Sequence, residues 1–144
     1  MPVALRPARP ADFPAVLRLL GQLWPDQELD ATRLGEAYRR GVEASDQEYL
    51  VAEGDGRVVG FASLCLLNSL WQAGNLGHIM ELVVEEESRG RGIGTQFLEA
   101  LIARAKERGC ARIELDSAFH RAEAHRFYES RGFVRRAYWF SRPI

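Results

Sequence analysis

The glycine-rich segment Arg89-Gly90-Arg91-Gly92-Ile93-Gly94 is the part of this chain whose residue types most clearly predict a ligand site. It follows an apolar run at residues 78–84 and precedes residues with helical spacing. Glycines let a ligand approach the backbone, and the first N–H groups of a helix lack intrahelical partners and lie at the positive end of its dipole. This order of strand, glycine turn and helix predicts a site for phosphate or pyrophosphate.

Two other nucleotide-binding loops fit the segment less well. A P-loop ends in Gly-Lys-Ser/Thr, and the only lysine of the chain is Lys106, inside the expected helix. A dinucleotide fingerprint has Gly-x-Gly-x-x-Gly after the first strand, whereas the spacing here is Gly90-x-Gly92-x-Gly94 past the middle of the chain. A glycine-rich connection that binds nothing is the remaining alternative.

The elements around the segment predict a mixed α/β fold in a single domain, residues 1–144. The expected strands are residues 3–7, 49–53, 57–67, 78–85, 111–116 and 133–140. The expected helices are residues 12–23, 30–43, 93–108 and 122–131.

Local signals define several of these boundaries. Asp12 and Asp30 are the expected N-cap residues of the first two helices. The tripeptide Gly54-Asp55-Gly56 predicts a hairpin turn, and residues 68–77 predict a loop. The helix after the glycine segment has one apolar stripe, formed by Ile93, Phe97, Leu98, Leu101, Ile102 and Ala105.

A further loop pattern, Arg/Gln-x-x-Gly-x-Gly/Ala, is filled by Arg89, Gly92 and Gly94. A second motif follows downstream: a strand, then Ala124-His-Arg-Phe-Tyr128, then Gly132-Phe133. Over residues 48–140 the chain resembles the GNAT superfamily of acyl-CoA-dependent N-acyltransferases, whose chains carry both motifs in this order. It is similar in particular to the aminoalkylphosphonate and aminoglycoside N-acetyltransferase-like branch, which also has Glu-Leu-Val-Val before the loop.

The resemblance implies a mixed, mostly antiparallel sheet of six to seven strands, with helices on both faces and a splayed central strand pair. It also implies acetyl-CoA as the acyl donor. Many family chains have Asn where Arg121 stands, so Ser117 or Arg121 must replace that contact, or the contact is missing. The residues expected at the cofactor are Leu82, Val83, Val84, Arg89, Gly90, Arg91, Gly92, Ile93, Gly94, Thr95, Ser117, Arg121, Ala124 and Phe127.

The resemblance also implies the catalytic groups. Glu81, on the strand before the loop, is the expected general base, with a solvated or ion-paired glutamate as the alternative. His78 would face the opposite side of a regular strand, so it could assist only if a β-bulge separated the two residues. Related chains usually have a carboxylate at the His78 position. Tyr128 is the expected acid for the leaving thiolate, with aromatic packing as the alternative.

The expected reaction is direct transfer of an acetyl group to the primary amine of a small molecule. Acidic and aromatic side chains suit a cationic acceptor, and the expected contacts are Trp24, Glu28, Trp71, His78 and Tyr138. A protein N-terminal or lysine acetyltransferase is one alternative, and an acetyl-CoA sensor without turnover is another. A hydrolase triad is disfavoured because no Gly-x-Ser-x-Gly elbow occurs.

Composition limits the remaining classes. A net charge of −1 without a Lys/Arg run argues against a nucleic-acid partner. No apolar run has transmembrane length, and residues 1–20 do not resemble a secretion signal, so we expect a cytoplasmic protein with two reduced cysteines. His120 and His125 are five residues apart, which is poor spacing for a metal site. A homodimer is left open.

Overall fold

The computed structural model describes residues 2–144, which form a mixed α/β fold with a five-stranded sheet of order β1-β2-β3-β4-β5. The chain divides after Glu114 into two compact units, residues 1–114 and 115–144. The strands are β1 (Ala4–Pro7), β2 (Gln47–Gly54), β3 (Arg57–Ser69), β4 (Gly74–Val84) and β5 (Ile113–Leu115). The α-helices are α1 (Phe13–Leu23), α2 (Ala31–Glu43), α3 (Ile93–Glu107) and α4 (Ala122–Glu129).

Strands β1 to β4 pair antiparallel with their neighbours. The hairpin between β2 and β3 turns at Asp55 and Gly56, whose φ angles of 52° and 72° match the left-handed turn that Asp-Gly predicts. The expected loop at residues 68–77 is wrong, because β3 and β4 continue to a register pair of Ser69 and Gly74. Cross-strand pairing therefore outweighs the loop-like composition of this stretch.

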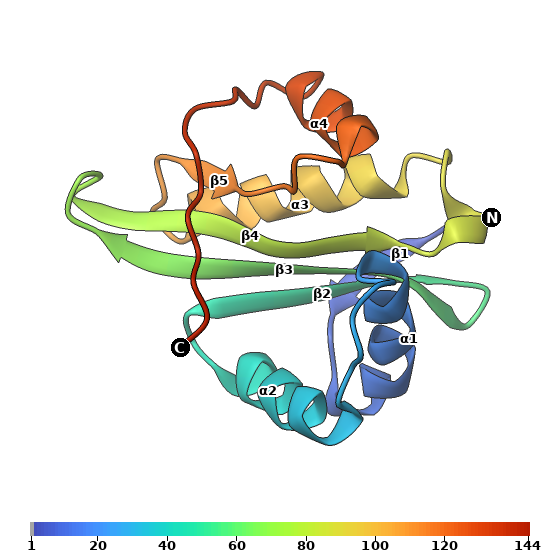
Figure 1. The fold of residues 1–144 in the computed structure, drawn as a ribbon. Coiled ribbons are helices and arrows are strands. Elements are labelled where there is room, and N and C mark those ends of the chain that lie inside the picture. The colour runs from blue at the N-terminus through green and yellow to red at the C-terminus, as the bar shows by residue number, and fades with distance from the viewer. Residues whose placement is uncertain (1) are drawn as a thin grey trace. The chain divides into compact units, whose positions relative to one another are not determined.

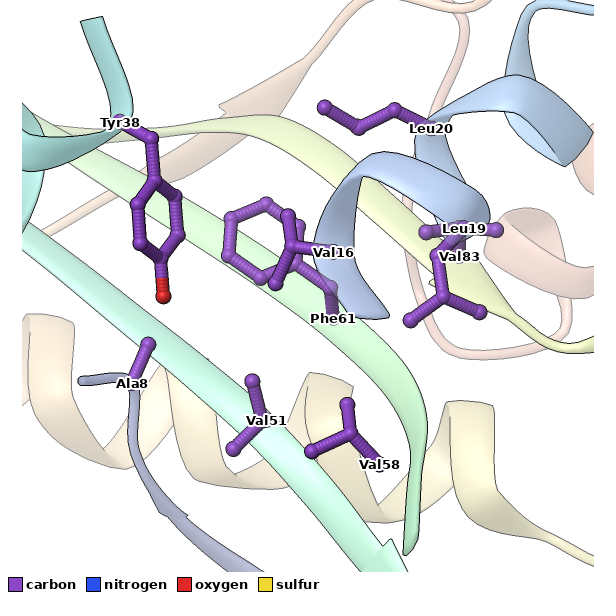
Figure 2. Close-up of a cluster of buried hydrophobic side chains, with 9 residues drawn as sticks. All are labelled: Ala8, Val16, Leu19, Leu20, Tyr38, Val51, Val58, Phe61 and Val83. Atoms are coloured by element: carbon purple, nitrogen blue, oxygen red, sulfur yellow. The ribbon is translucent and has the colours of Figure 1, made fainter. Parts of the chain in front are cut away.

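One face of the sheet packs against α1 and α2 (Figure 1). The buried cluster on this face contains residues of α1, α2 and the sheet, together with Ala8, which directly follows β1 (Figure 2). Val51, Phe61 and Val83 stand opposite one another on three neighbouring strands, which places their side chains on the same face. The cluster consists of Ala8, Val16, Leu19, Leu20, Tyr38, Val51, Val58, Phe61 and Val83.

The opposite face packs against α3 (Figure 1). All but one residue of the expected apolar stripe of α3 are buried, and Ile102 is half-buried. Gly60 faces this helix closely, since a Cβ there would lie 2.6 Å from the Phe97 ring. Helix α3 is thereby fixed over the sheet, and its N-terminus lies directly after the glycine segment.

The two expected N-caps differ in outcome. Asp30 caps α2, where its carboxylate accepts the backbone N–H of Arg33 at 3.1 Å. Asp12 precedes α1 but gives it no side-chain cap. Its carboxylate instead accepts two bonds from Arg6 and the backbone N–H of Arg9, at 2.8–2.9 Å. The carboxylate oxygens that could have capped α1 therefore accept hydrogen bonds from Arg6 and from the Arg9 backbone.

The second unit contains α4 and the chain that follows it. Residues 133–140, expected to form a strand, have no regular secondary structure, so the sheet has five strands and not six to seven. A strand requires hydrogen bonds from a neighbour, and an apolar sequence pattern does not supply that neighbour. Within the described residues, none of the helices has both the length and the apolar character needed to cross a membrane.

Candidate active site

A β-bulge in β4 decides which side chains share the face covered by α1 and α2. Ser63 of β3 stands opposite Glu81, but the next residue, Leu64, stands opposite Ile79, so Met80 is the extra residue. Cys65 then stands opposite His78. Because Ser63 and Cys65 point to one side of β3, the bulge brings Glu81 and His78 to the same face. The bulge that the sequence required for this arrangement is confirmed.

Ser63 holds the Glu81 carboxylate. The Ser63 hydroxyl donates to Glu81 Oε1 at 2.5 Å and accepts the backbone N–H of Glu81 at 3.1 Å. Tyr49 of β2 stands opposite Ser63. Burial, followed by the negative charge of Glu81, raises the pKa of the Tyr49 phenol. Glu81 is therefore half-buried, with the Ser63 hydroxyl bonded to its carboxylate.

His78 is only 5% exposed and lies beside the thiol-bearing Cys65 in the next register pair. Burial and the charge of Asp46 raise the pKa of Cys65. Burial also raises the pKa of Cys110, against the opposing charge of Arg108. Both cysteines are free thiols, and a raised pKa keeps them protonated at neutral pH, which makes either a poor nucleophile.

The glycine segment has the backbone geometry that close approach of a ligand requires. Gly90 and Gly92 have φ angles of 78° and 81°, and a Cβ built at either would have open space around it. Gly92 is the N-cap of α3, so it offers the first helical N–H groups no side chain. Arg89 does not point freely outward, because its Nε donates to the carbonyl of Val84 at 2.9 Å. Arg91 is exposed.

Of the three consecutive glutamates before this segment, residues 85–87, the first is buried and the other two are exposed. Glu85 is 3% exposed, and it accepts hydrogen bonds from Arg18, Arg57 and Ser88. Burial alone would raise its pKa, but the bonds from Ser88 and Arg18 and the charge of Arg57 hold the pKa of Glu85 below its usual value. Glu86 and Glu87 are exposed, as a solvated turn requires.

The other expected cofactor residues, at the end of β4 and the start of α3, are either buried or half-buried. Val83 and Ile93 are buried, while Leu82, Val84, Gly94 and Thr95 are half-buried. The N–H of Gly77 in β4 donates to the carbonyl of Arg112, the residue just before β5. The splay expected between these strands further along stays a prediction.

The second unit carries the other expected site residues. The Tyr128 ring makes edge contacts with Phe127 and Phe133, with ring centroids 5.4 and 5.7 Å apart. Burial raises the pKa of Tyr128, against an opposing effect of the Arg121 charge. Arg121 is the N-cap of α4, and Ala124 lies in its first turns. The Ser117 hydroxyl is buried and has no hydrogen-bond partner among the described residues.

The expected acceptor contacts lie on several elements. Trp24 packs against the hydrophobic cluster, which fits a core role, and Glu28 is exposed on the α1–α2 connection. Trp71 lies in the turn between β3 and β4, with the Arg112 guanidinium 4.9 Å from its ring centroid. Tyr138, in the second unit, is 76% exposed and contacts Phe119. Only His78 is placed beside Glu81 by the sheet register.

Ser63, Tyr49 and Cys65 were not anticipated at the site. A serine within the apolar run of β3 was the available signal, since a buried hydroxyl requires a partner. No group of three or more His, Cys, Asp or Glu side chains in residues 2–144 is arranged to hold a metal ion.

The fold agrees with comparisons to known proteins. The model of the acetyltransferase (GNAT) family matches residues 10–133, so this chain belongs to that family. It is 32% identical to an aminoalkylphosphonate N-acetyltransferase of Salmonella typhimurium, covering 100% of this chain and 94% of the relative. It is 28% identical to an aminoglycoside N(6')-acetyltransferase type 1 of Stenotrophomonas maltophilia, covering 97% and 93%.

A solved structure from Bacillus halodurans, described as a transcriptional regulator, has a TM-score of 0.87 at 27% identity and covers 99% of this chain and 100% of its own. The family and its named relatives define the class of this protein: it is an acyltransferase enzyme.

Proposed function

We propose that this enzyme transfers the acetyl group of acetyl-CoA to a primary amine of a small molecule by direct attack. The observation that carries the proposal is the β4 bulge, which puts Glu81 and His78 on one face of the sheet with Ser63 and Tyr49. An acceptor amine is mostly protonated at neutral pH, and a carboxylate held in place by a hydroxyl can take the surplus proton. Glu81 is the base in this proposal, and His78 is an auxiliary group or acceptor contact.

The residues of the glycine segment fit acetyl-CoA. Two left-handed glycines with open space beside them and the N-terminus of α3 offer backbone N–H groups to phosphate oxygens. The buried Ser117 hydroxyl without a partner among the described residues could supply the cofactor bond that many family chains make with Asn at the place of Arg121. Acetyl-CoA, when bound, would supply the acetyl group as a thioester, and CoA would leave as the free thiol.

Tyr128 is the proposed acid for the departing sulfur. Its raised pKa keeps the phenol protonated throughout the neutral range, so a proton is available for donation. Its packing against Phe127 and Phe133 would fix the ring, so the aromatic contacts and the acid role are compatible. The acceptor nitrogen loses a second proton as the C–N bond forms and the C–S bond breaks, and this proton, carried by solvent, would restore the Tyr128 phenol, while the proton taken by Glu81 passes to solvent.

A small cationic amine is the proposed acceptor class. The relatives named for aminoalkylphosphonates and aminoglycosides support small amines over proteins. Glu28 and Glu81 supply negative charge in the first unit, and Trp71 and Tyr138 are exposed aromatic surfaces. A homodimer and a cytoplasmic location stay predictions.

The test is a screen for thiol release from acetyl-CoA with polyamines, aminoglycosides, aminoalkylphosphonates and peptides with free N-termini. Turnover of a small amine that Glu81→Gln abolishes would support the proposal. Turnover of peptides alone would favour a protein acetyltransferase. Acetyl-CoA binding without turnover of any amine would favour a sensor.

A further inference from the structure

The turn between β4 and the glycine segment makes hydrogen bonds to both α1 and β3. Residues Glu86–Ser88 form a short 3₁₀ turn, and Glu85 precedes it at the end of β4. The N–H of Glu85 donates to the carbonyl of Val59 at 2.8 Å, and its own carbonyl accepts the N–H of Ser88 at 2.9 Å. These backbone bonds fix where the chain leaves the sheet.

The Glu85 side chain adds charged anchors to this turn. Its Oε1 accepts from Arg18 of α1 at 3.0 Å and from both terminal nitrogens of Arg57 of β3, at 2.5 and 2.9 Å. Its Oε2 accepts the Ser88 hydroxyl at 2.7 Å. Arg18 also donates to the Val58 carbonyl at 2.9 Å, so one guanidinium joins α1, β3 and the turn.

Helix α1 holds the turn at a second point. Gln22 lies four residues after Arg18, on the same face of α1. Its Oε1 accepts the backbone N–H of Glu86 at 2.9 Å. At the other end of the turn, the side chain of Arg89 bonds the Val84 carbonyl. The chain from Val84 to Arg89 therefore enters the glycine segment in one fixed direction.

We propose that Glu85 is the positioning residue of the glycine segment. Its buried carboxylate fastens the turn to α1 and β3, so that Gly90 and Gly92 keep the backbone conformation that receives the cofactor. This inference rests on the proposed function of the segment as the acetyl-CoA loop. Glycines at positive φ are intrinsically flexible, and a loop held from one end by a buried charge network loses less entropy when it binds.

The test compares Glu85→Gln with the matched variant Glu48→Gln. Glu48 is also a carboxylate between two arginines, Arg104 and Arg108, each at 3.0 Å, but it joins β2 to α3 away from the turn. Amide hydrogen exchange of residues 89–96 is measured in the ligand-free proteins, and the dissociation constant of CoA is measured by calorimetry. Gln22→Ala and Ser88→Ala serve as milder variants if Glu85→Gln fails to fold.

In Glu85→Gln we expect amide exchange of residues 89–96 to accelerate about tenfold and the CoA dissociation constant to rise about tenfold. The kcat at saturating acetyl-CoA should change less than about threefold. General destabilisation would not weaken CoA binding while leaving kcat nearly unchanged. Unchanged exchange in Glu85→Gln, or equal acceleration in Glu48→Gln, would overturn the inference. Failure of the wild-type protein to bind CoA would refute the proposed function instead, and the exchange data would still decide whether Glu85 holds the loop.

Discussion

Glu81, near the end of β4, and Glu85, directly after it, are four residues apart, yet the hydrogen-bond partners described for them differ in kind. Glu85 is bonded by two arginines and by Ser88, and its pKa is held low. Glu81 is bonded by the Ser63 hydroxyl and lies on the same face of the sheet as Tyr49 and His78. A carboxylate fixed by two guanidinium groups is stabilised as an anion and is a weak proton acceptor.

A hydroxyl orients a carboxylate without adding a positive charge. In the proposed mechanism the two positions have different tasks: Glu85 fixes the path of the chain before the loop, and Glu81 takes the proton of the acceptor amine. Substitutions at other positions can test this distinction, because some should affect only proton transfer and others only the loop conformation or folding.

The largest effect is expected for Tyr128→Phe, which keeps the ring packing and removes the hydroxyl. The kcat should fall by roughly 10²–10⁴-fold, the usual contribution of general acid–base help, with the acetyl-CoA dissociation constant within a few-fold of wild type. The loss should shrink with an acyl donor whose thiol is more acidic, because a better leaving group needs less proton donation. Equal losses with both donors would count against the acid role.

Gly92→Val should remove cofactor binding without unfolding the protein. A β-branched residue is strained at a φ of 81°, so the loop must change its backbone conformation. In wild type, acetyl-CoA at a hundred times its dissociation constant should stabilise the fold by about 2.7 kcal/mol. That stabilisation, measured by thermal denaturation, should vanish in the variant.

Gly56→Val is the matched control for this loop substitution. Gly56 has a φ of 72° and open space around a Cβ, but it lies in the β2–β3 turn. It should lose stability and keep the shift produced by acetyl-CoA. Normal cofactor binding by Gly92→Val would show that the loop assignment is wrong.

Asp12→Asn should affect folding and not the cofactor. Asp12 is 8% exposed, and the hydrogen bonds from Arg6 hold its pKa low against the opposing effect of burial, with a further contribution from the N–H of Arg9. Loss of these charged bonds should lower the free energy of unfolding by about 2 kcal/mol at neutral pH. Urea denaturation with and without acetyl-CoA measures both quantities.

The pH dependence of this difference has a definite sign. A carboxyl whose pKa is lower in the folded state stabilises the protein above its unfolded pKa of about 3.9, and the contribution disappears as the pH falls through the folded value. The gap between wild type and Asp12→Asn should therefore narrow below about pH 4. A gap that stays constant down to that range would show that Asp12 stabilises the fold by packing alone.

The smallest effect is expected for Asp30→Ala, which removes the side-chain cap of α2. The free energy of unfolding should fall by about 1 kcal/mol, and Asp30→Ser should recover most of it, because serine is also a good N-cap. Both variants should bind acetyl-CoA normally. No loss of stability in Asp30→Ala would mean that the bond to the Arg33 N–H contributes nothing measurable.

Local signals predicted the elements that depend on neighbouring residues. The Asp-Gly turn, the Asp30 cap, the apolar stripe of α3 and the glycine segment all follow from nearby sequence, and the structure confirms the elements they define. The extension of β3 beyond Leu67, the start of β4 before His78 and the lack of a strand at residues 133–140 depend on pairing between distant segments. Sequence spacing does not reveal such pairing.

The same division applies to the site. The register of β3 against β4 decides that Ser63 contacts Glu81, and no motif records that register. Likewise the burial of Glu85 depends on Arg18 and Arg57, which lie far away along the chain. The sequence could indicate that Glu81 and His78 would share a face only with a bulge, but the structure was needed to find it.

The most direct measurement determines kcat and the acetyl-CoA dissociation constant for Glu81→Gln and Glu85→Gln side by side, across about pH 6 to 9. Glu81→Gln should lower kcat by roughly 10²-fold or more, most strongly at low pH where the acceptor amine is most protonated, with cofactor affinity nearly unchanged. Glu85→Gln should weaken cofactor binding and keep kcat at saturation. A Glu81→Gln enzyme as active as wild type at every pH would contradict the account and make His78 the next candidate for the base.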